Sequence, residues 1–315
     1  MKRGRRSTPP GQHRPVMLEE VLHLLDVQPG AAAVDRTVGW AGHAVELLRR
    51  AGSDGRLIGL DLDAENLPRA RERLSETGLL FHLYHSNFAG LPAILASEGI
   101  ATVQALLADL GMSSMQVDDA DRGFSYVREG PLDMRMDRSR GRTAAQLLAT
   151  LSEQELARAL REVGDEPDAE RIAAALVAAR QKGTLERTSD VSRVILDATH
   201  PSRAKAPWRL HPSPGRWNLH PAARTFQVLR ILVNRELANL QQLLRVLPTV
   251  LAPGGVAAII SFHSGEDGLV KAAFRDGLRS GVYQAVADAP LRAAPEERQN
   301  NPRSRSAKLR WARRG

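Results

Sequence analysis

The 315-residue sequence contains no cysteine, few aromatic residues and no long hydrophobic run. Without cysteine, the chain forms no disulfide, no zinc site with thiolate ligands and no cysteine nucleophile. No uninterrupted apolar run approaches the ~20 residues that span a bilayer, so we expect no membrane partner. The basic first residues precede no apolar segment of the kind found in secretory signals, which favours a cytoplasmic enzyme. Because only 4% of residues are aromatic, we expect a core made mainly of Leu, Val, Ile and Ala.

The formal net charge of +8 is concentrated at the two ends of the chain. Residues 1–14 contain five basic residues and no acidic one, and residues 298–315 contain seven basic residues and no acidic one. The rest of the chain holds 32 basic and 36 acidic residues, which is a charge of −4. Two interpretations stay open: the ends keep the protein in solution, or they bind a polyanion, whose phosphates attract Lys and Arg.

Short β-rich runs alternate with amphipathic helical segments, a pattern typical of an α/β fold with a doubly wound parallel sheet. Strands are predicted at residues 33–38, 56–61, 80–85, 103–109, 256–262, 282–287 and 306–310. Helices are predicted at residues 17–25, 43–50, 64–76 and 224–247, the last as one long helix with a single buried stripe.

The alternation stops between residues 138 and 217, where the sequence predicts helices only. Ser152 and Glu155 have the spacing of a capping box at the start of one of them. Residues 200–221 combine tryptophans with basic residues, which suits an RNA-binding loop. We therefore predict a flexible basic segment (1–12), a Rossmann-like domain (13–137 and 218–315) and an inserted helical domain for substrate recognition (138–217).

Three strand ends indicate a nucleotide site. The turn from Asp35 to His43 consists largely of small residues and leads into a helix, whose first N–H groups can bind an anion. Asp61 ends the second strand, where a carboxylate can accept hydrogen bonds from both ribose hydroxyls, and Asp109 ends the fourth strand. NAD enzymes and methyltransferases share these features. The turn lacks the GxGxxG spacing, which argues against a dinucleotide cofactor.

Longer motifs carry a more specific signal. The segment DLGMSSMQVDDADRGFSYVREGPLDMRMD (109–137) closely resembles the signature of the RsmH (MraW) family of ribosomal RNA methyltransferases. HRPVMLEEVL (13–22), HPAARTFQVLRILVNREL (220–237), SFHSGED (261–267) and NPRSRSAKLR (301–310) resemble that family in the same order along the chain. The resemblance implies a Rossmann-like methyltransferase domain with a helical insertion. It implies S-adenosylmethionine as methyl donor and, as substrate, the exocyclic amino nitrogen of a cytidine in 16S ribosomal RNA within the small ribosomal subunit.

The resemblance also implies a set of site residues. By motif match, the donor contacts Ala41, Gly42, His43, Asp61, Phe88, Asp109 and Gln116. Asp109 is the candidate catalytic residue, because it borders both the donor and the target amine. The candidates for binding the base or its neighbours are Phe124, Asp133, His263 and Arg224. We predict no metal, because the histidines at 200, 211 and 220 are widely spaced and have no acidic ligand beside them.

Three positions depart from the family's pattern. Ala41 replaces the second glycine of the family's GxGGH turn, which is tolerable only if its φ is negative. Gly265 and Gly268 replace a leucine and an arginine of the family's SFHSLEDR motif. These changes leave two alternatives open: a methyltransferase acting on another amine, and a non-catalytic ribosome-binding or assembly factor that kept the fold.

Overall fold

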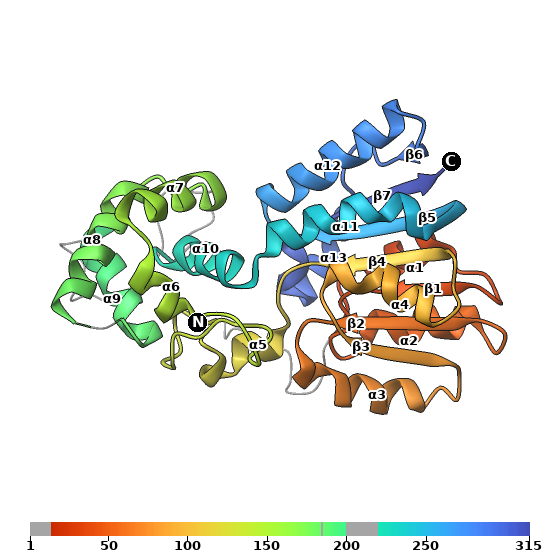
Figure 1. Cartoon of the computed structure of the whole chain (residues 1–315), viewed down its shortest axis with the longest axis horizontal. Coiled ribbons are helices and arrows are strands. Elements are labelled where there is room, and N and C mark those ends of the chain that lie inside the picture. The colour runs from red at the N-terminus through yellow and green to blue at the C-terminus, as the bar shows by residue number, and fades with distance from the viewer. Residues whose placement is uncertain (1–13, 184, 200–219) are drawn as a thin grey trace. The chain divides into compact units, whose positions relative to one another are not determined.

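The computed structural model describes residues 14–183, 185–199 and 220–315 (Figure 1). These residues form two compact units. The sheet unit contains the described residues up to Gly111 and those from Leu237 onward, and the helical unit consists of those between Met112 and Glu236. The predicted basic segment 1–12 and residues 200–219 of the predicted RNA-binding loop lie outside the described residues.

The described part of the sheet unit is built on a seven-stranded sheet with the order β3-β2-β1-β4-β5-β7-β6. Its strands are β1 (Ala32–Asp35), β2 (Arg56–Asp61), β3 (Phe81–His85), β4 (Val103–Asp109), β5 (Leu251–Ser261), β6 (Tyr283–Val286) and β7 (Lys308–Arg314). The first five run parallel, as predicted, whereas β7 is antiparallel to both β5 and β6. The sheet is therefore mixed, because β7 returns between β5 and β6, but the predicted α/β fold is confirmed.

Helices cover both faces of this sheet and bury two separate cores. Side chains of successive strand residues point to opposite faces, so Ala33, Leu57 and Leu107 belong to one core, and Val34 and Leu106 to the other. The first core packs against α1 (Leu18–Leu25), α2 (Gly42–Ala51) and α3 (Leu67–Ser75). The second packs against α4 (Leu91–Ser97), α11 (Glu236–Val250) and α12 (Ser264–Arg279), and a short helix, α13, spans Pro295–Asn300.

The helical unit contains α5 (Ser114–Asp118), α6 (Ala144–Thr150), α7 (Glu153–Gly164), α8 (Ala169–Lys182), α9 (Thr188–Thr199) and α10 (Ala223–Asn234). The predicted capping box of α7 is confirmed, because the Ser152 and Glu155 side chains each accept a hydrogen bond from the other's backbone N–H. The unit begins earlier and ends later than the predicted insertion 138–217. Residues 131–137 bond to its helices: Met136 N–H, for example, donates to the side chain of Asn234 in α10 at 2.7 Å.

The prediction of one long helix over residues 224–247 was wrong. Arg235 adopts a left-handed conformation with φ 52°, which ends α10, and α11 begins at the next residue. Phe226 and Leu229 consequently face the interior of the helical unit, whereas Leu240 and Leu247 enter a core of the sheet unit. The apparent single stripe therefore belongs to two helices with different surroundings.

Within the residues that the structure describes, we find no helix that combines the length and hydropathy required to cross a membrane.

Candidate active site at the carboxyl edge of the sheet

Three aspartates gather where neighbouring parallel strands end. Asp35 ends β1, Asp61 ends β2 and Asp109 ends β4, and these strands are adjacent in the sheet. By the alternation of side chains, all three point to the face that α2 covers. The side chain of Asp109 is 19% exposed, and the other two residues are buried. The carboxyl edge of this face therefore concentrates negative charge where α/β sheets bind ligands.

Asp61 fixes the turn that follows β1. One of its carboxylate oxygens accepts hydrogen bonds from Gly39 N–H at 2.7 Å and from the Asn66 side chain at 3.3 Å. The other oxygen accepts from Asp63 N–H at 2.8 Å. Burial raises the pKa of Asp61 to about 6, although these hydrogen bonds oppose the shift. The carboxylate is held between the ends of β1 and β2, and its ribose-binding role stays a prediction.

Asp109 is the least satisfied of the three carboxylates. One of its oxygens has no hydrogen-bond partner in the described residues and is shielded from solvent. Burial raises its pKa to about 7; the negative charge of Glu266 adds to the shift and Arg303 opposes it. Its backbone N–H donates to Thr37 Oγ1 at 2.7 Å, which links the end of β4 to the turn after β1. Asp109 is therefore ready to accept a hydrogen bond, a positive charge or a proton.

His43 lies beside Asp109 in the first turn of α2. Its Nε2 donates to the carbonyl of Val16 at 2.9 Å, which leaves Nδ1 as the acceptor nitrogen, 3.9 Å from an oxygen of Asp109. Burial lowers the pKa of His43, so the ring is neutral at physiological pH. A neutral ring does not compensate the charge of Asp109. Asp35 faces the same pair, and burial raises its pKa to about 6.

The turn before α2 carries strain at Ala41. Its φ is 60°, in the left-handed region, so the condition under which alanine would be tolerated here, a negative φ, is not met. The side chain is completely buried, so the methyl group is accommodated by packing while the backbone remains strained. Gly42 follows in helical conformation, and a Cβ there would approach Pro15 to 3.0 Å. The backbone at these two positions is thus closely packed beside the strand ends.

Phe88 occupies a short 3-10 helix (Phe88–Gly90) that follows β3. Its ring is half-buried at the same edge of the sheet, and the guanidinium carbon of Arg36 lies 4.7 Å from the ring centroid. Sequence reasoning singled out Phe88 but missed both Arg36 and the role of Asp35. The sequence shows two adjacent ionisable residues, Asp35 and Arg36, where β1 ends, but it does not show that Arg36 is buried.

The remaining donor-site candidate, Gln116, lies in the helical unit. It forms a capping box with Ser113 at the start of α5, and its side chain is buried. His263 lies in the sheet unit, just after β5, where its ring caps α12 and its Nε2 is 3.3 Å from Glu266. The predicted role of Gln116 at the donor and that of His263 at the base both stay predictions.

Three further candidates for binding the base lie in the helical unit. Phe124 is only 4% exposed, so its ring is not free to stack on a base in this conformation. Arg224 is half-buried in α10, where it faces Glu166. Asp133 accepts two hydrogen bonds from the Arg135 side chain, at 2.7 and 2.9 Å. Burial would raise the pKa of Asp133, but the bonds from Arg135 outweigh it and the pKa lies below its ordinary value.

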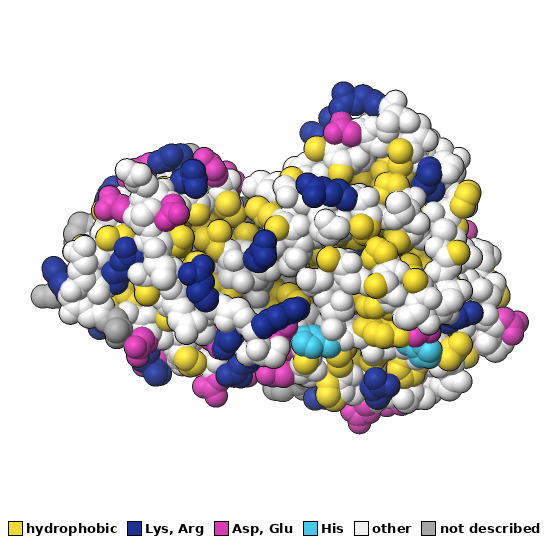
Figure 2. All heavy atoms as spheres, viewed as in Figure 1, with side chains coloured by type: hydrophobic (Ala, Val, Ile, Leu, Met, Phe, Trp, Pro, Cys, Tyr) yellow, Lys and Arg dark blue, Asp and Glu magenta, His cyan; other side chains and the backbone are white. Residues whose placement is uncertain are grey.

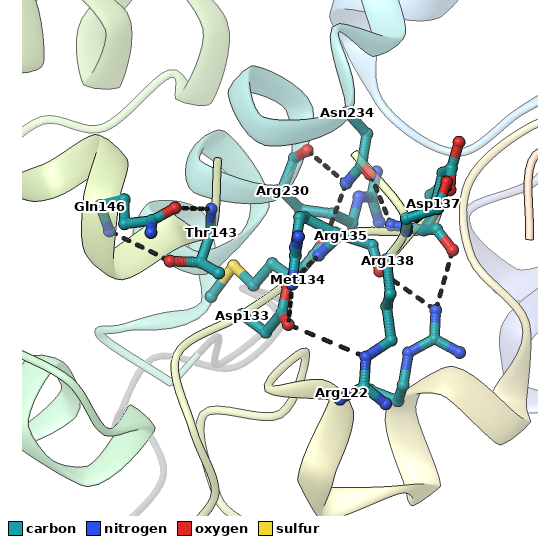
Figure 3. Close-up of polar contacts among 12 residues, drawn as sticks. Arg122, Asp133, Met134, Arg135, Asp137, Arg138, Thr143, Gln146, Arg230 and Asn234 are labelled. Carbon is teal, nitrogen blue, oxygen red and sulfur yellow. Dashed lines mark hydrogen bonds and ion pairs between the residues drawn. The ribbon is translucent and has the colours of Figure 1, made fainter. Parts of the chain in front are cut away.

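Asn234 holds the loop that contains Asp133 (Figure 3). Its side chain, from the last residue of α10, accepts from Met136 N–H at 2.7 Å and donates to the carbonyl of Met134 at 2.8 Å. Arg122 donates to the carbonyls of Arg135 and Met136, both at 3.1 Å. The loop is therefore fixed from two sides by buried polar groups, although Met134 has a φ of 63°.

Nearly the whole chain is similar to a group of known proteins. Ribosomal RNA small subunit methyltransferase H of Geobacter sp. (strain M21) is 42% identical over 313 residues, covering 95% of this chain and 97% of the relative. The proteins of the same name from Pelobacter propionicus and Sorangium cellulosum are each 43% identical; they cover 95% and 96% of this chain and 97% and 91% of their own lengths. Residues 11–315 match the MraW methylase family. The chain therefore belongs to the MraW methylase family, as its motifs indicated.

Proposed function

We propose that this protein transfers a methyl group from S-adenosylmethionine to the exocyclic amino nitrogen of a cytidine in 16S ribosomal RNA. The observation that carries the proposal is the group of three carboxyls at the ends of β1, β2 and β4; two are buried, and the third, Asp109, is mostly buried and has an oxygen without a hydrogen-bond partner among the described residues. A sulfonium donor brings positive charge to such a site, which favours the ionised carboxylates that burial disfavours. The names of the relatives, ribosomal RNA small subunit methyltransferases, support the substrate.

The proposed donor site uses the edge of the sheet unit. Asp61 would bind the ribose hydroxyls, and the ring of Phe88 would contact the adenine. The N–H groups of Gly42 and His43, in the first turn of α2, would bind the carboxylate of the donor's methionine part. Ala41 completes the proposed set in this unit by motif match, and the donor role of Gln116, in the helical unit, stays a prediction.

Asp109 is the proposed catalytic residue. The amino nitrogen of cytosine is a weak nucleophile, because its lone pair is delocalised into the ring. Asp109 would hold the amine in line with the methyl group, which is the larger part of the acceleration in such transfers. Its raised pKa, about 7, also suits it to accept the proton that the nitrogen loses when the N–C bond forms. His43 Nδ1 would accept a hydrogen bond from the protonated carboxyl.

The RNA partner and the location follow from the substrate. We infer that the substrate is presented within the small ribosomal subunit in the cytoplasm, and that the helical unit contacts RNA. Figure 2 shows Lys and Arg side chains next to Asp and Glu on the visible face of this unit. Arg128 pairs with Asp118 and Arg140 pairs with Asp137, and both arginine side chains are at least half exposed. An arginine in such an exposed pair can leave its carboxylate partner and bind a phosphate of the RNA.

The experiment supplies small subunits that lack the modification, the purified protein and donor labelled in its methyl group. We expect N4-methylcytidine in the 16S RNA, and about a thousandfold loss of the rate for Asp109→Asn. Asp54→Asn, at an exposed aspartate outside the site, is the matched control and should transfer at the normal rate. Label found only in DNA or protein would reject the ribosomal substrate, and full activity of Asp109→Asn would remove Asp109 from the mechanism.

A further inference from the structure

Arg36 is a buried cation without a hydrogen-bonding partner. It follows Asp35 at the end of β1 and is only 1% exposed. None of its three side-chain nitrogens makes a hydrogen bond among the described residues. Its guanidinium lies over the ring of Phe88, whose centroid is 4.7 Å from the guanidinium carbon.

Such an arrangement does not stabilise the empty protein. Burial lowers the pKa of Arg36 to about 9, so the side chain still carries its charge at neutral pH. A buried charge loses its hydration, and a single aromatic contact replaces little of it. An apolar side chain of similar length would be more favourable at this position, as replacements of buried ion groups in other proteins indicate. A ligand that accepts hydrogen bonds from the guanidinium would therefore stabilise the charge at this position.

The register of the sheet places Arg36 at the proposed donor site but on the other face from the carboxylates. Its backbone N–H bonds to the carbonyl of Leu107, the residue of β4 that pairs with Asp35 at the end of β1. By alternation its side chain points to the α4 and α11 face, whereas Asp35 points to the α2 face. Ser86 N–H bonds to the carbonyl of Asp61, which brings Phe88, two residues later, to the same edge.

We propose that Arg36 recognises the adenine ring of the methyl donor by donating hydrogen bonds from its guanidinium to acceptor nitrogens of the purine. The inference rests on the proposed donor site. In that site the carboxylates on the α2 face contact the ribose hydroxyls and the sulfonium. The adenine then lies on the side of Phe88 and Arg36. The purine nitrogens N1, N3 and N7 only accept hydrogen bonds, and a guanidinium only donates them. Arg36 would thus determine specificity for the base of the donor.

The test compares S-adenosylhomocysteine with its 1-deaza, 3-deaza and 7-deaza analogues, each of which replaces one ring nitrogen by a C–H group. Binding to the wild-type protein and to Arg36→Met is measured by calorimetry. We expect at least one analogue to bind the wild type tenfold or more weakly than the parent compound. The same analogue should bind Arg36→Met within about twofold of the parent, because the donor of the hydrogen bond is gone. Equal ratios in both proteins would overturn the inference.

Three controls separate the possible failures. Arg56→Met, at the opposite end of the neighbouring strand, should keep the wild-type ratios. Thermal unfolding should show Arg36→Met to be at least as stable as the wild type, so that a change in binding is not a loss of folding. Asp61→Asn should weaken all four compounds alike. If the wild type binds none of them, the donor site itself is wrong; if Arg36→Met weakens only RNA binding, the cation binds phosphate and not adenine.

Discussion

At the scale of single residues, the charge state of Asp109 links the site to pH. Its pKa is raised to about 7, so the carboxylate is mostly protonated at pH 6 and ionised at pH 8. An ionised carboxylate attracts the sulfonium of S-adenosylmethionine but not the neutral thioether of S-adenosylhomocysteine. We expect the ratio of their affinities to shift toward S-adenosylmethionine as the pH rises from 5 to 8. Calorimetric titrations of both compounds measure it, and a ratio independent of pH would show that Asp109 does not face the sulfur.

The strained residue Ala41 gives a second prediction at this scale. An alanine-to-glycine change in a loop ordinarily destabilises, because glycine loses more entropy on folding. At φ 60° the change also removes the strain of the left-handed conformation, which is about 1 kcal/mol or more for a residue with a Cβ. We therefore expect Ala41→Gly to leave the free energy of unfolding within about 0.5 kcal/mol or to raise it. Ala31→Gly, at a buried loop alanine outside the left-handed positions, is the comparison, and an equal loss in both variants would contradict the argument.

At the scale of elements, Asn234 connects the end of α10 to the loop that carries Asp133. Its amide bonds to Met136 N–H and to the carbonyl of Met134, and the residue is 8% exposed. Asn234→Ala leaves these buried backbone groups unpaired, so we expect it to lower the free energy of unfolding by about 2–4 kcal/mol. Arg235→Gly, at the next residue, should instead raise it by up to about 1 kcal/mol, because glycine suits the left-handed position that ends the helix. Chemical denaturation of both variants measures the two effects.

Some elements could be predicted from the sequence and others could not. The bounds of β2 and β4 were predicted correctly, because continuous apolar runs end there at an aspartate. The break at Arg235 was not predictable, since neither glycine nor proline marks it and the apolar spacing continues across it. The direction of β7 was also missed, because an alternating strand has the same pattern whichever way it runs.

At the scale of the whole molecule, the boundary between the two units depends on long-range contacts. Residues 112–137 follow β4 directly, so the sequence assigned them to the Rossmann-like domain, but their hydrogen bonds lead to α9 and α10. Composition alone does not contain that information. The position of Asp61 and Asp109 at one edge of the sheet was predictable, because each ends a strand within a motif; their roles at the donor stay predictions. Arg36 was not predictable, because its significance comes from the absence of an acceptor among the described residues, which requires coordinates.

The stability of the whole chain should depend on pH through the buried carboxyls. The folded-state pKa values of Asp35, Asp61 and Asp109 are raised to about 6, 6 and 7, above the value of about 3.9 in an unfolded chain. Between pH 4 and 7 the folded state therefore holds more protons than the unfolded state, and the free energy of unfolding contributed by these groups falls as the pH rises. Asp133 and Asp267, whose pKa values lie below the ordinary value, give the opposite slope at lower pH.

The variant Asp109→Asn isolates one of these contributions, because it removes the titration and keeps the shape of the side chain. We compare the free energy of unfolding of the variant with that of the wild type at each pH. This difference should be about 2–4 kcal/mol more in favour of the variant at pH 8 than at pH 4.5, since each unit of pKa shift corresponds to about 1.4 kcal/mol. Denaturant unfolding at both pH values measures the difference, and Asp54→Asn should show none. Saturating S-adenosylmethionine should stabilise the wild type most at pH 8, where the ionised carboxylate meets the cation, and Asp109→Asn much less. That result would place the donor's positive charge beside Asp109, at the end of β4. Equal stabilisation of both proteins at both pH values would place the charge elsewhere.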